Sequence, residues 1–66
     1  MTAPHDLPAA IGRPATRALT QAGHSGLGQL TELTEADLVA LHGVGPKAVR
    51  ILRETLAVRG LSFRRP

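Results

Sequence analysis

One stretch of the chain decides the fold: residues 38–52 read LVALHGVGPKAVRIL. The apolar residues before the two glycines predict a helix, and Pro46 opens a second one, because its missing N–H is not needed in a first helical turn. Gly43 can end the first helix in a left-handed conformation, and Gly45 can let the backbone approach another molecule closely. Such a turn leaves N–H groups beside a helix N-terminus, where they attract anions. Since Lys47 adds a positive charge there, the stretch predicts a clamp for a phosphate group.

The same stretch resembles the helix-hairpin-helix motif of DNA-binding and DNA-repair proteins. The resemblance rests on the pattern L-x-x-L-x-G-V-G-P-K-A, in which both glycines, the apolar residue between them, the lysine and the flanking leucines fall in place. It implies binding to the nucleic-acid backbone with little base preference. The alternative is a tight connection between two core helices, with glycines that serve turn geometry alone. The structural context of the motif decides between the two.

The composition indicates a small helical domain. Sixty-six residues make one domain near the lower size limit for a self-sufficient core. There is no cysteine, so neither a disulfide nor a thiolate metal site supports that core, and Phe63 is the only aromatic residue. A core of leucine, isoleucine, valine and alanine favours helices over a sheet. Because no apolar run is long enough to span a membrane and residues 1–6 do not resemble a signal peptide, we expect a cytoplasmic monomer without membrane contact.

The charge is unevenly distributed along the chain. The net charge is +3, yet residues 24–43 hold three acidic residues and no lysine or arginine. Six of the eight basic residues follow residue 43. This concentration of positive charge after the hairpin favours an anionic partner. A solvated, arginine-rich helix face would have the same composition.

Boundary signals divide the chain into three parts. We expect a flexible N-terminus over residues 1–6, a helix-hairpin-helix domain over residues 7–63 and a flexible basic tail over residues 64–66. The domain should be all-α, a compact arrangement of five helices without a strand. Turn-like residues 7–12 lead into it, and the clearest helical segments are residues 14–22, 26–31, the stretch that begins after Thr34, and 46–59.

Capping residues and glycines set the predicted helix ends. Gly23 and Gly60 follow the first and last helices. Ser25 can cap the short helix, and Thr34 can cap the next one with Asp37 as its capping-box partner. Residues at helical spacing predict the buried faces. They are Ala15, Ala18, Leu19, Ala22, Leu27, Leu30, Leu38, Leu41, Ala48, Ile51, Leu52, Thr55 and Leu56, and Leu61 and Phe63 should fold back to close the core.

Two parts of the chain are similar at an offset of 33 residues. Residues 11–19 (IGRPATRAL) match residues 44–52 (VGPKAVRIL) in glycine, alanine, arginine and leucine. Two such units, packed with pseudo-twofold symmetry, would place two N–H-rich turns side by side. Each turn could hold a phosphate, one from each strand of a duplex, across the minor groove. The turn at Gly12 should be the weaker clamp, because Ala10 stands in the position of Gly43.

With both units included, residues 7–63 resemble the C-terminal domain of the bacterial RNA polymerase α subunit. Besides the first-helix segment that ends in Leu19, the shared segments are GQL (28–30), TEADL (34–38), GPK (45–47) and RGLS (59–62). The resemblance implies a five-helix, doubled helix-hairpin-helix domain. It also implies contact with the DNA minor groove through the start of the first helix and the turn before the last one. Gly45 and Lys47 match the contacts of that second turn.

The departures from this family concern base recognition. Ala48 stands where the family has a serine, Pro14 where its first helix has an arginine, and Arg17 where it has an asparagine contact. Arg13 lies one residue from the position of that arginine. The resemblance therefore implies backbone binding better than any base preference. We expect a free-standing bacterial protein of this fold, since the chain carries no larger polymerase domain.

The predicted function is binding of double-stranded DNA through its phosphates, with little sequence specificity. The residues expected to contact DNA lie in the two turns and the helix starts: Gly12, Arg13, Arg17, Gly43, Val44, Gly45, Lys47, Ala48 and Arg50. The alternative is a protein-interaction module of the same fold, in which Glu32, Glu35 and Asp37 meet a basic partner.

The sequence shows no pattern for metal binding or catalysis. His5, His24 and His42 lack metal-site spacing, and no cysteine supports them. His42, at the hairpin, could touch a phosphate or simply be exposed, and we expect it to be exposed. The acidic residues show no pairing suited to acid–base chemistry, and the serines lack a neighbouring base. We therefore expect neither an enzyme nor a cofactor.

Overall fold

The computed structural model describes residues 6–65, and within them it contains helices and turns but no strand. The elements are η1, a 3-10 helix (Ala9–Ile11), followed by the α-helices α1 (Arg13–Gln21), α2 (Leu27–Leu30), α3 (Glu35–Val39) and α4 (Pro46–Val58). The all-α prediction is confirmed for these residues, but the count of five helices is wrong, since the structure has four α-helices. The turn-like segment before α1 forms only η1, because Pro8 before it is extended and Gly12 after it has a φ of 88°.

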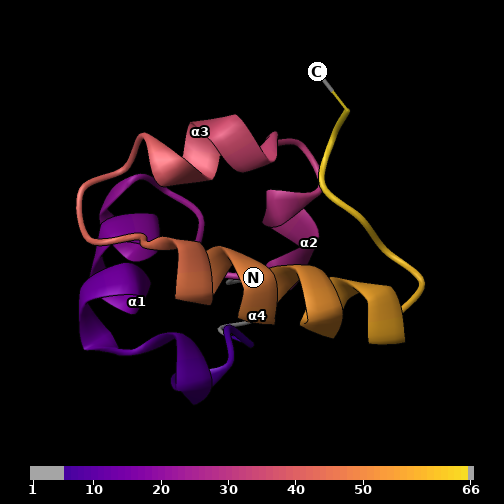
Figure 1. Ribbon diagram of the computed structural model, residues 1–66, viewed down its shortest axis with the longest axis horizontal. Helices are drawn as coiled ribbons and strands as arrows, with labels where there is room; N and C mark the ends of the chain where they lie inside the picture. The colour runs from indigo at the N-terminus through magenta and orange to yellow at the C-terminus, as the bar shows by residue number, and fades with distance from the viewer. Residues whose placement is uncertain (1–5, 66) are drawn as a thin grey trace.

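The helices surround one core (Figure 1). α3 and α4 run in opposite directions and are joined by a turn at the left of the view, beside α1. α4 packs against η1 and α3. The C-terminal segment runs back past α2, where Arg64 N–H donates to Leu33 O at 2.8 Å. The last helix, α4, is therefore packed against both η1 and α3.

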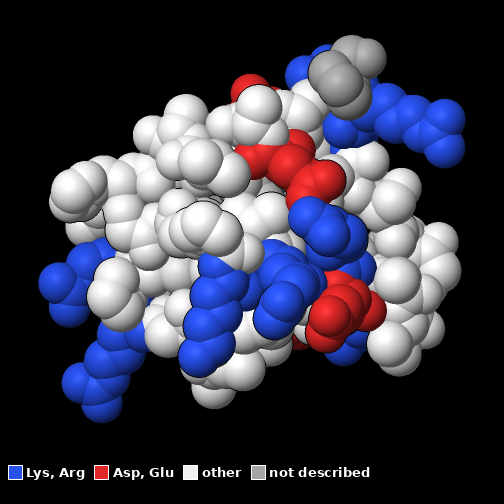
Figure 2. All heavy atoms as spheres, viewed as in Figure 1, with Lys and Arg blue, Asp and Glu red and all other residues white. Residues whose placement is uncertain are grey.

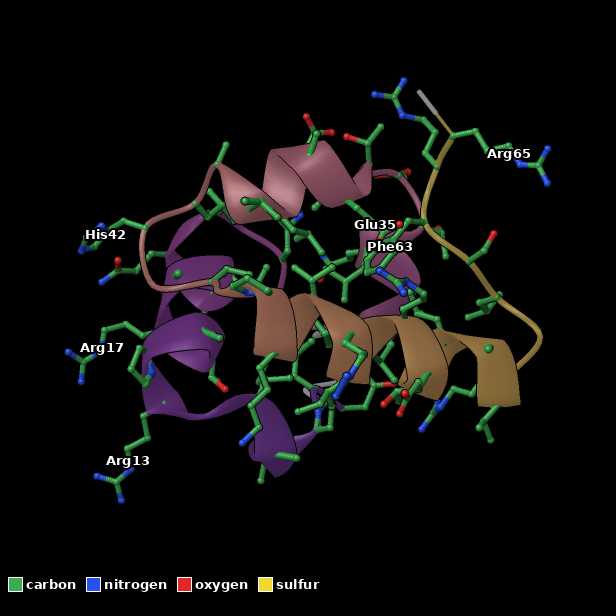
Figure 3. All side chains as sticks on the ribbon, viewed as in Figure 1. Arg13, Arg17, Glu35, His42, Phe63 and Arg65 are labelled. Carbon is green, nitrogen blue, oxygen red and sulfur yellow. The ribbon has the colours of Figure 1, made fainter. Side chains whose placement is uncertain are left out.

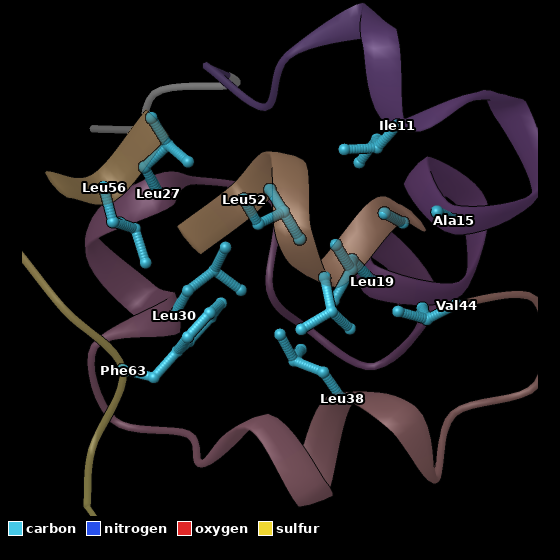
Figure 4. Packing of buried hydrophobic residues seen from close by; sticks show 12 residues of the cluster. Ile11, Ala15, Leu19, Leu27, Leu30, Leu38, Val44, Leu52, Leu56 and Phe63 are labelled. Carbon is cyan, nitrogen blue, oxygen red and sulfur yellow. The ribbon is translucent and has the colours of Figure 1, made fainter. Parts of the chain in front are cut away.

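A single cluster of apolar side chains fills the centre (Figure 4). Full burial of a leucine side chain stabilises a fold by about 1.5–3 kcal/mol. The fully buried leucines are Leu19, Leu27, Leu30, Leu38, Leu52 and Leu56. Phe63 joins them with 9% exposure, as predicted. The core prediction is wrong for Ala22, which is exposed at the end of α1, and for Leu61, which is 39% exposed.

Both longer helices end as their glycines predict. Gly23, with a φ of 88°, follows α1, and Gly60, with a φ of 73°, follows α4. Leu61 N–H then donates to Leu56 O at 2.8 Å, and α1 ends with the same pattern. This Schellman arrangement satisfies carbonyl groups that the end of a helix leaves without partners.

The predicted capping box at α3 is confirmed. Asp37 N–H donates to Thr34 Oγ1 at 3.1 Å, and Thr34 N–H donates to Asp37 Oδ2 at 3.0 Å. The predicted cap of α2 is wrong, because Gly26 rather than Ser25 occupies the N-cap position. Asp6 supplies the missing acceptor from a distant part of the chain, since its Oδ1 accepts from Leu27 N–H at 2.7 Å. A carboxylate at this end also complements the helix dipole.

The predicted flexible ends, residues 1–6 and 64–66, fall partly outside the described residues. Among the described ones, Asp6 Oδ2 also lies 3.3 Å from Arg59 Nη1 at the end of α4. The folded unit therefore includes Asp6 and Arg64. Within residues 6–65 no helix has both the length and the apolar character needed to cross a membrane.

Candidate nucleic-acid interface

The two glycines of the turn between α3 and α4 have different roles. We call residues 42–45 the hairpin turn. Gly43 has the predicted left-handed conformation, with a φ of 99°, whereas Gly45 has a φ of −95°. The prediction that Gly43 ends the helix before it is wrong, because α3 already ends at Val39. A Cβ atom at Gly43 would lie 3.0 Å from Pro14 O, but a Cβ atom at Gly45 would meet nothing within 4 Å. Gly43 therefore serves the packing of the turn on α1, and Gly45 leaves open space in front of the start of α4.

The first turn of α4 presents backbone donors without acceptors. Pro46 has no N–H, and the first helical bond is made by Val49 N–H, which donates to Gly45 O at 3.1 Å. Within the described residues, the N–H groups of Lys47 and Ala48 have no backbone acceptor. These donors and the dipole of a 13-residue helix concentrate positive potential where the exposed Lys47 side chain stands.

Two of the predicted contact residues can take part only through their backbone. The side chains of Val44 and Ala48 belong to the core, with exposures of 5% and 6%. Val44 N–H is already engaged, since it donates to Leu41 O at 3.2 Å. Of these two residues, Ala48 alone retains a backbone donor.

The two similar segments repeat in their helices but not in their turns. Ile11, Ala15 and Leu19 are buried, as are their counterparts at offset 33, and Gly12 and Gly45 both occupy N-cap positions. However, Gly12 has a φ of 88°, whereas the positive φ of the second unit lies two residues earlier, on Gly43. Ala10 stands in the position of Gly43, and alanine rarely adopts positive φ. The chain reversal therefore falls on Gly12 in the first unit.

The hairpin turn and α1 together form a basic groove of about 330 Å³. We call it the α1 groove. Figure 3 shows Arg13, Arg17 and His42 projecting from the same edge of the molecule. The α1 groove is lined by Arg13, Pro14, Arg17, Ala18, Gln21, His42 and Gly43. Two of its polar residues, His42 and Gln21, were not among the predicted contact residues. His42 directly precedes Gly43, and Gln21 lies one helical turn after Arg17.

A second basic groove lies along the start of α4. It has a volume of about 450 Å³ and is lined by Pro46, Lys47, Arg50 and Arg53. We call it the α4 groove. Five of the nine predicted contact residues line these grooves, with Arg13, Arg17 and Gly43 in one and Lys47 and Arg50 in the other. Gly12 lines neither of them. Arg53 was missed, but it follows Arg50 at i+3 and so shares its face of the helix.

Ion pairs engage some of the basic side chains and leave others without a carboxylate partner. The pairs join Arg53 to Glu35, Arg59 to Asp6 and Arg64 to Asp37. Within residues 6–65, no carboxylate lies within 4 Å of the charged groups of Arg13, Arg17, Lys47 or Arg50. Figure 2 shows basic side chains at the left edge and the lower centre of this face, with acidic side chains at its top and also beside the basic ones to the right of the centre. The predicted phosphate contacts are therefore cations whose charge is not neutralised within the described fold.

The acidic residues of α3 are engaged inside the molecule. Arg53 Nε donates to Glu35 Oε1 at 3.0 Å. The backbone N–H of Thr34, and after it the Thr34 hydroxyl, hold the pKa of Asp37 below its ordinary value of 3.8, with a further lowering by Arg64. Glu35 thus connects the start of α3 to α4, and Asp37 connects it to the C-terminal segment.

The histidines do not gather into a metal site. His42 is exposed, as predicted, and His24 is half-buried just after α1. Within residues 6–65, no three histidine, aspartate or glutamate side chains come together in a way that could hold a metal ion. His5 lies outside the described residues.

Comparison of the chain with protein-family models, with curated proteins and with solved structures found no match. The assignment of a function therefore rests on the two grooves, their charges and their backbone donors.

Proposed function

We propose that this protein is a DNA-binding module of the helix-hairpin-helix type that holds the phosphate backbone across the minor groove with little sequence preference. One observation carries the proposal. The four predicted phosphate contacts, Arg13, Arg17, Lys47 and Arg50, are without a carboxylate partner in the described residues, whereas Arg53, Arg59 and Arg64 are paired. Arg65, in the C-terminal segment, is the other basic residue of residues 6–65 without such a partner. Charges of one sign that are left unpaired on one part of a surface attract an anionic polymer.

The α4 groove has the features of a phosphate clamp. Lys47 and Arg50 lie one helical turn apart and line the same groove. The free N–H of Lys47 stands at the N-terminus of the longest helix, and Gly45 has open space around its Cα. A phosphate in this position would gain both the lysine charge and the backbone donor.

The α1 groove supplies a second grip in the proposal. Arg13 and Arg17 lie at i and i+4 on α1, so their guanidinium groups can approach one phosphate or two successive ones. The close packing of Gly43 on Pro14 holds the hairpin turn against the helix that carries them. In the proposal, the α1 groove and the α4 groove each bind one of the two strands that border a minor groove, and the contact between Gly43 and Pro14 holds the two grooves together.

Contacts of this kind fix the position of the protein but do not read sequence. Phosphate contacts carry no base information, and a groove lined by arginine, lysine and backbone donors fits any sequence. A noncatalytic role in the cytoplasm of a bacterial cell, where the chromosome is in reach, accords with the proposal.

The acidic residues argue against a protein-interaction module that uses the α3 face. Glu35 is paired with Arg53, and Asp37 with Thr34 and Arg64. Of the three acidic residues in this alternative, Glu32 alone is exposed without an ion pair in the described residues. A basic partner would have to compete with these internal contacts. We therefore favour DNA over a basic protein as the ligand.

Titration with a short duplex at several salt concentrations tests the proposal. If three or four phosphates are neutralised, log K should fall by roughly three units for each tenfold rise in salt. Two duplexes of unrelated sequence should bind with nearly equal affinity. An affinity that does not change with salt would contradict the proposal, and a strong preference for one sequence would indicate base recognition instead.

A further inference from the structure

A histidine lies in the α1 groove beside two arginines. His42 belongs to the hairpin turn, is exposed, and lines the groove together with Arg13 and Arg17 of α1. Figure 3 shows all three side chains on the same edge of the molecule. Histidine is the side chain whose ordinary titration lies closest to physiological pH. The groove thus joins two permanently charged side chains to a histidine.

The charged groups around His42 are cations. From α1 they are Arg13 and Arg17, and no carboxylate lines the groove. On the preceding helix, Glu35 and Asp37 are engaged with Arg53 and Arg64, near the far end of α3. On the following helix, Lys47 and Arg50 line the α4 groove. The lysine and arginine residues that line the α1 groove, Arg13 and Arg17, therefore have no acidic residue beside them in its lining.

A bound phosphate favours the protonated form of an imidazole. A phosphate held by Arg13 and Arg17 would accept a hydrogen bond from a protonated imidazole. Binding of an anion in this groove should therefore be coupled to the uptake of a proton. By linkage, affinity must then rise as the pH falls through the titration range of histidine.

We propose that His42 is a third phosphate contact in the α1 groove and makes DNA binding tighter at lower pH. This inference rests on the proposed function, since the phosphate belongs to a duplex. It assigns a role to a side chain that the helix-hairpin-helix pattern leaves unassigned. In general, if a bound phosphate raises the pKa of a histidine by one unit, the affinities of the two protonation states for that phosphate differ about tenfold.

The test is a titration with one short duplex at about pH 6 and about pH 8, at constant ionic strength. The parent protein should bind roughly three- to tenfold more tightly at the lower pH. His42→Gln should reduce this ratio to less than about twofold, because glutamine can donate a hydrogen bond but does not titrate. His42→Arg should bind tightly at both pH values, since its charge is permanent.

A double variant, His5→Gln with His24→Gln, is the matched control. It removes the two other histidines of the sequence, and it should keep the pH ratio of the parent. His24, which the structure describes, does not line the α1 groove. Circular dichroism of each variant at both pH values confirms that the fold is unchanged.

The outcomes separate this inference from the function on which it rests. The role of His42 is supported if the affinity ratio between the two pH values is lost in His42→Gln and kept in the double variant. If His42→Gln keeps the parent ratio while Lys47→Glu still weakens binding, the role of His42 is overturned and the proposed function stands. If the parent does not bind the duplex at either pH and low salt, both are overturned.

Discussion

Gly43 packs closely against Pro14, which lies far from it in the sequence: a Cβ atom at Gly43 would lie only 3.0 Å from the carbonyl oxygen of Pro14. This contact joins the hairpin turn to the first turn of α1. It brings together two parts of the chain that carry separate groups of cations, and it requires the smallest residue at position 43. The geometry of the proposed DNA interface therefore depends on a packing contact.

Gly43→Ala should destabilise the fold. The new Cβ would be strained both by the φ of 99° and by the Pro14 carbonyl, so we expect a loss of about 1–3 kcal/mol in the free energy of unfolding. Gly45→Ala is the matched control, because its φ of −95° suits any residue and its Cβ would meet nothing within 4 Å. Urea denaturation measures both. Equal losses for the two variants would contradict the different roles assigned to the glycines.

Lys47→Glu should weaken duplex binding more than Arg65→Glu. Both changes alter the net charge equally, but Lys47 lies in the α4 groove and Arg65 in the C-terminal segment. We expect roughly tenfold or greater weakening for Lys47→Glu, independent of duplex sequence, and a salt slope smaller by about one or more. Fluorescence anisotropy with a labelled duplex gives both quantities. Stronger weakening by Arg65→Glu would show that the chain end carries the affinity.

Glu35→Gln should strengthen duplex binding. The change releases Arg53 from its ion pair and leaves three free cations along the α4 groove. The pair is about half exposed, so its loss should cost less than about 1 kcal/mol of stability. Glu32→Gln alters the net charge by the same amount at an exposed residue that does not line the α4 groove, and it should raise affinity less. A larger gain for Glu32→Gln would indicate that net charge alone matters.

Asp37→Asn should lower stability at neutral pH but not in strong acid. The Thr34 N–H and hydroxyl, and then Arg64, lower the pKa of Asp37 in the folded protein below 3.8. Its contribution is therefore present above pH 3.8 and is lost as the pH falls through the lowered value. The melting temperatures of variant and parent should differ at about pH 7 and converge at about pH 2. A difference that persists unchanged in acid would show that the carboxylate charge is not its source.

The sequence predicted the helix ends well because their signals are local. Thr34 and Asp37 are three residues apart, and the glycines after α1 and α4 stand directly beside the helices that they end. The errors involve contacts between distant segments. Asp6 caps α2 by accepting a hydrogen bond from Leu27 N–H. Asp6 lies 21 residues before Leu27, and nothing near α2 in the sequence indicates this contact. Val49 was not predicted in the core, but α4 packs against η1 and α3 and so buries a wider face than one helical stripe.

The candidate site could be predicted only in part for the same reason. The motif identified Lys47 and the positive φ of Gly43 from residue type and spacing. It could not distinguish Arg50 from Arg53, since both are arginines on one helix and only the position of Glu35 in space separates them. Nor could it indicate that Arg13, Arg17 and His42 share a groove, because that depends on the packing of Gly43 against Pro14.

The most direct test of the account is an NMR titration of the 15N-labelled protein with a short duplex at low salt. The account predicts that the amide signals of Lys47, Ala48 and Arg50, and those of Arg13 and Arg17, move together and return when salt is added. Shifts confined to the acidic residues of α3, or to Arg64 and Arg65, would contradict it, as would the absence of any shift.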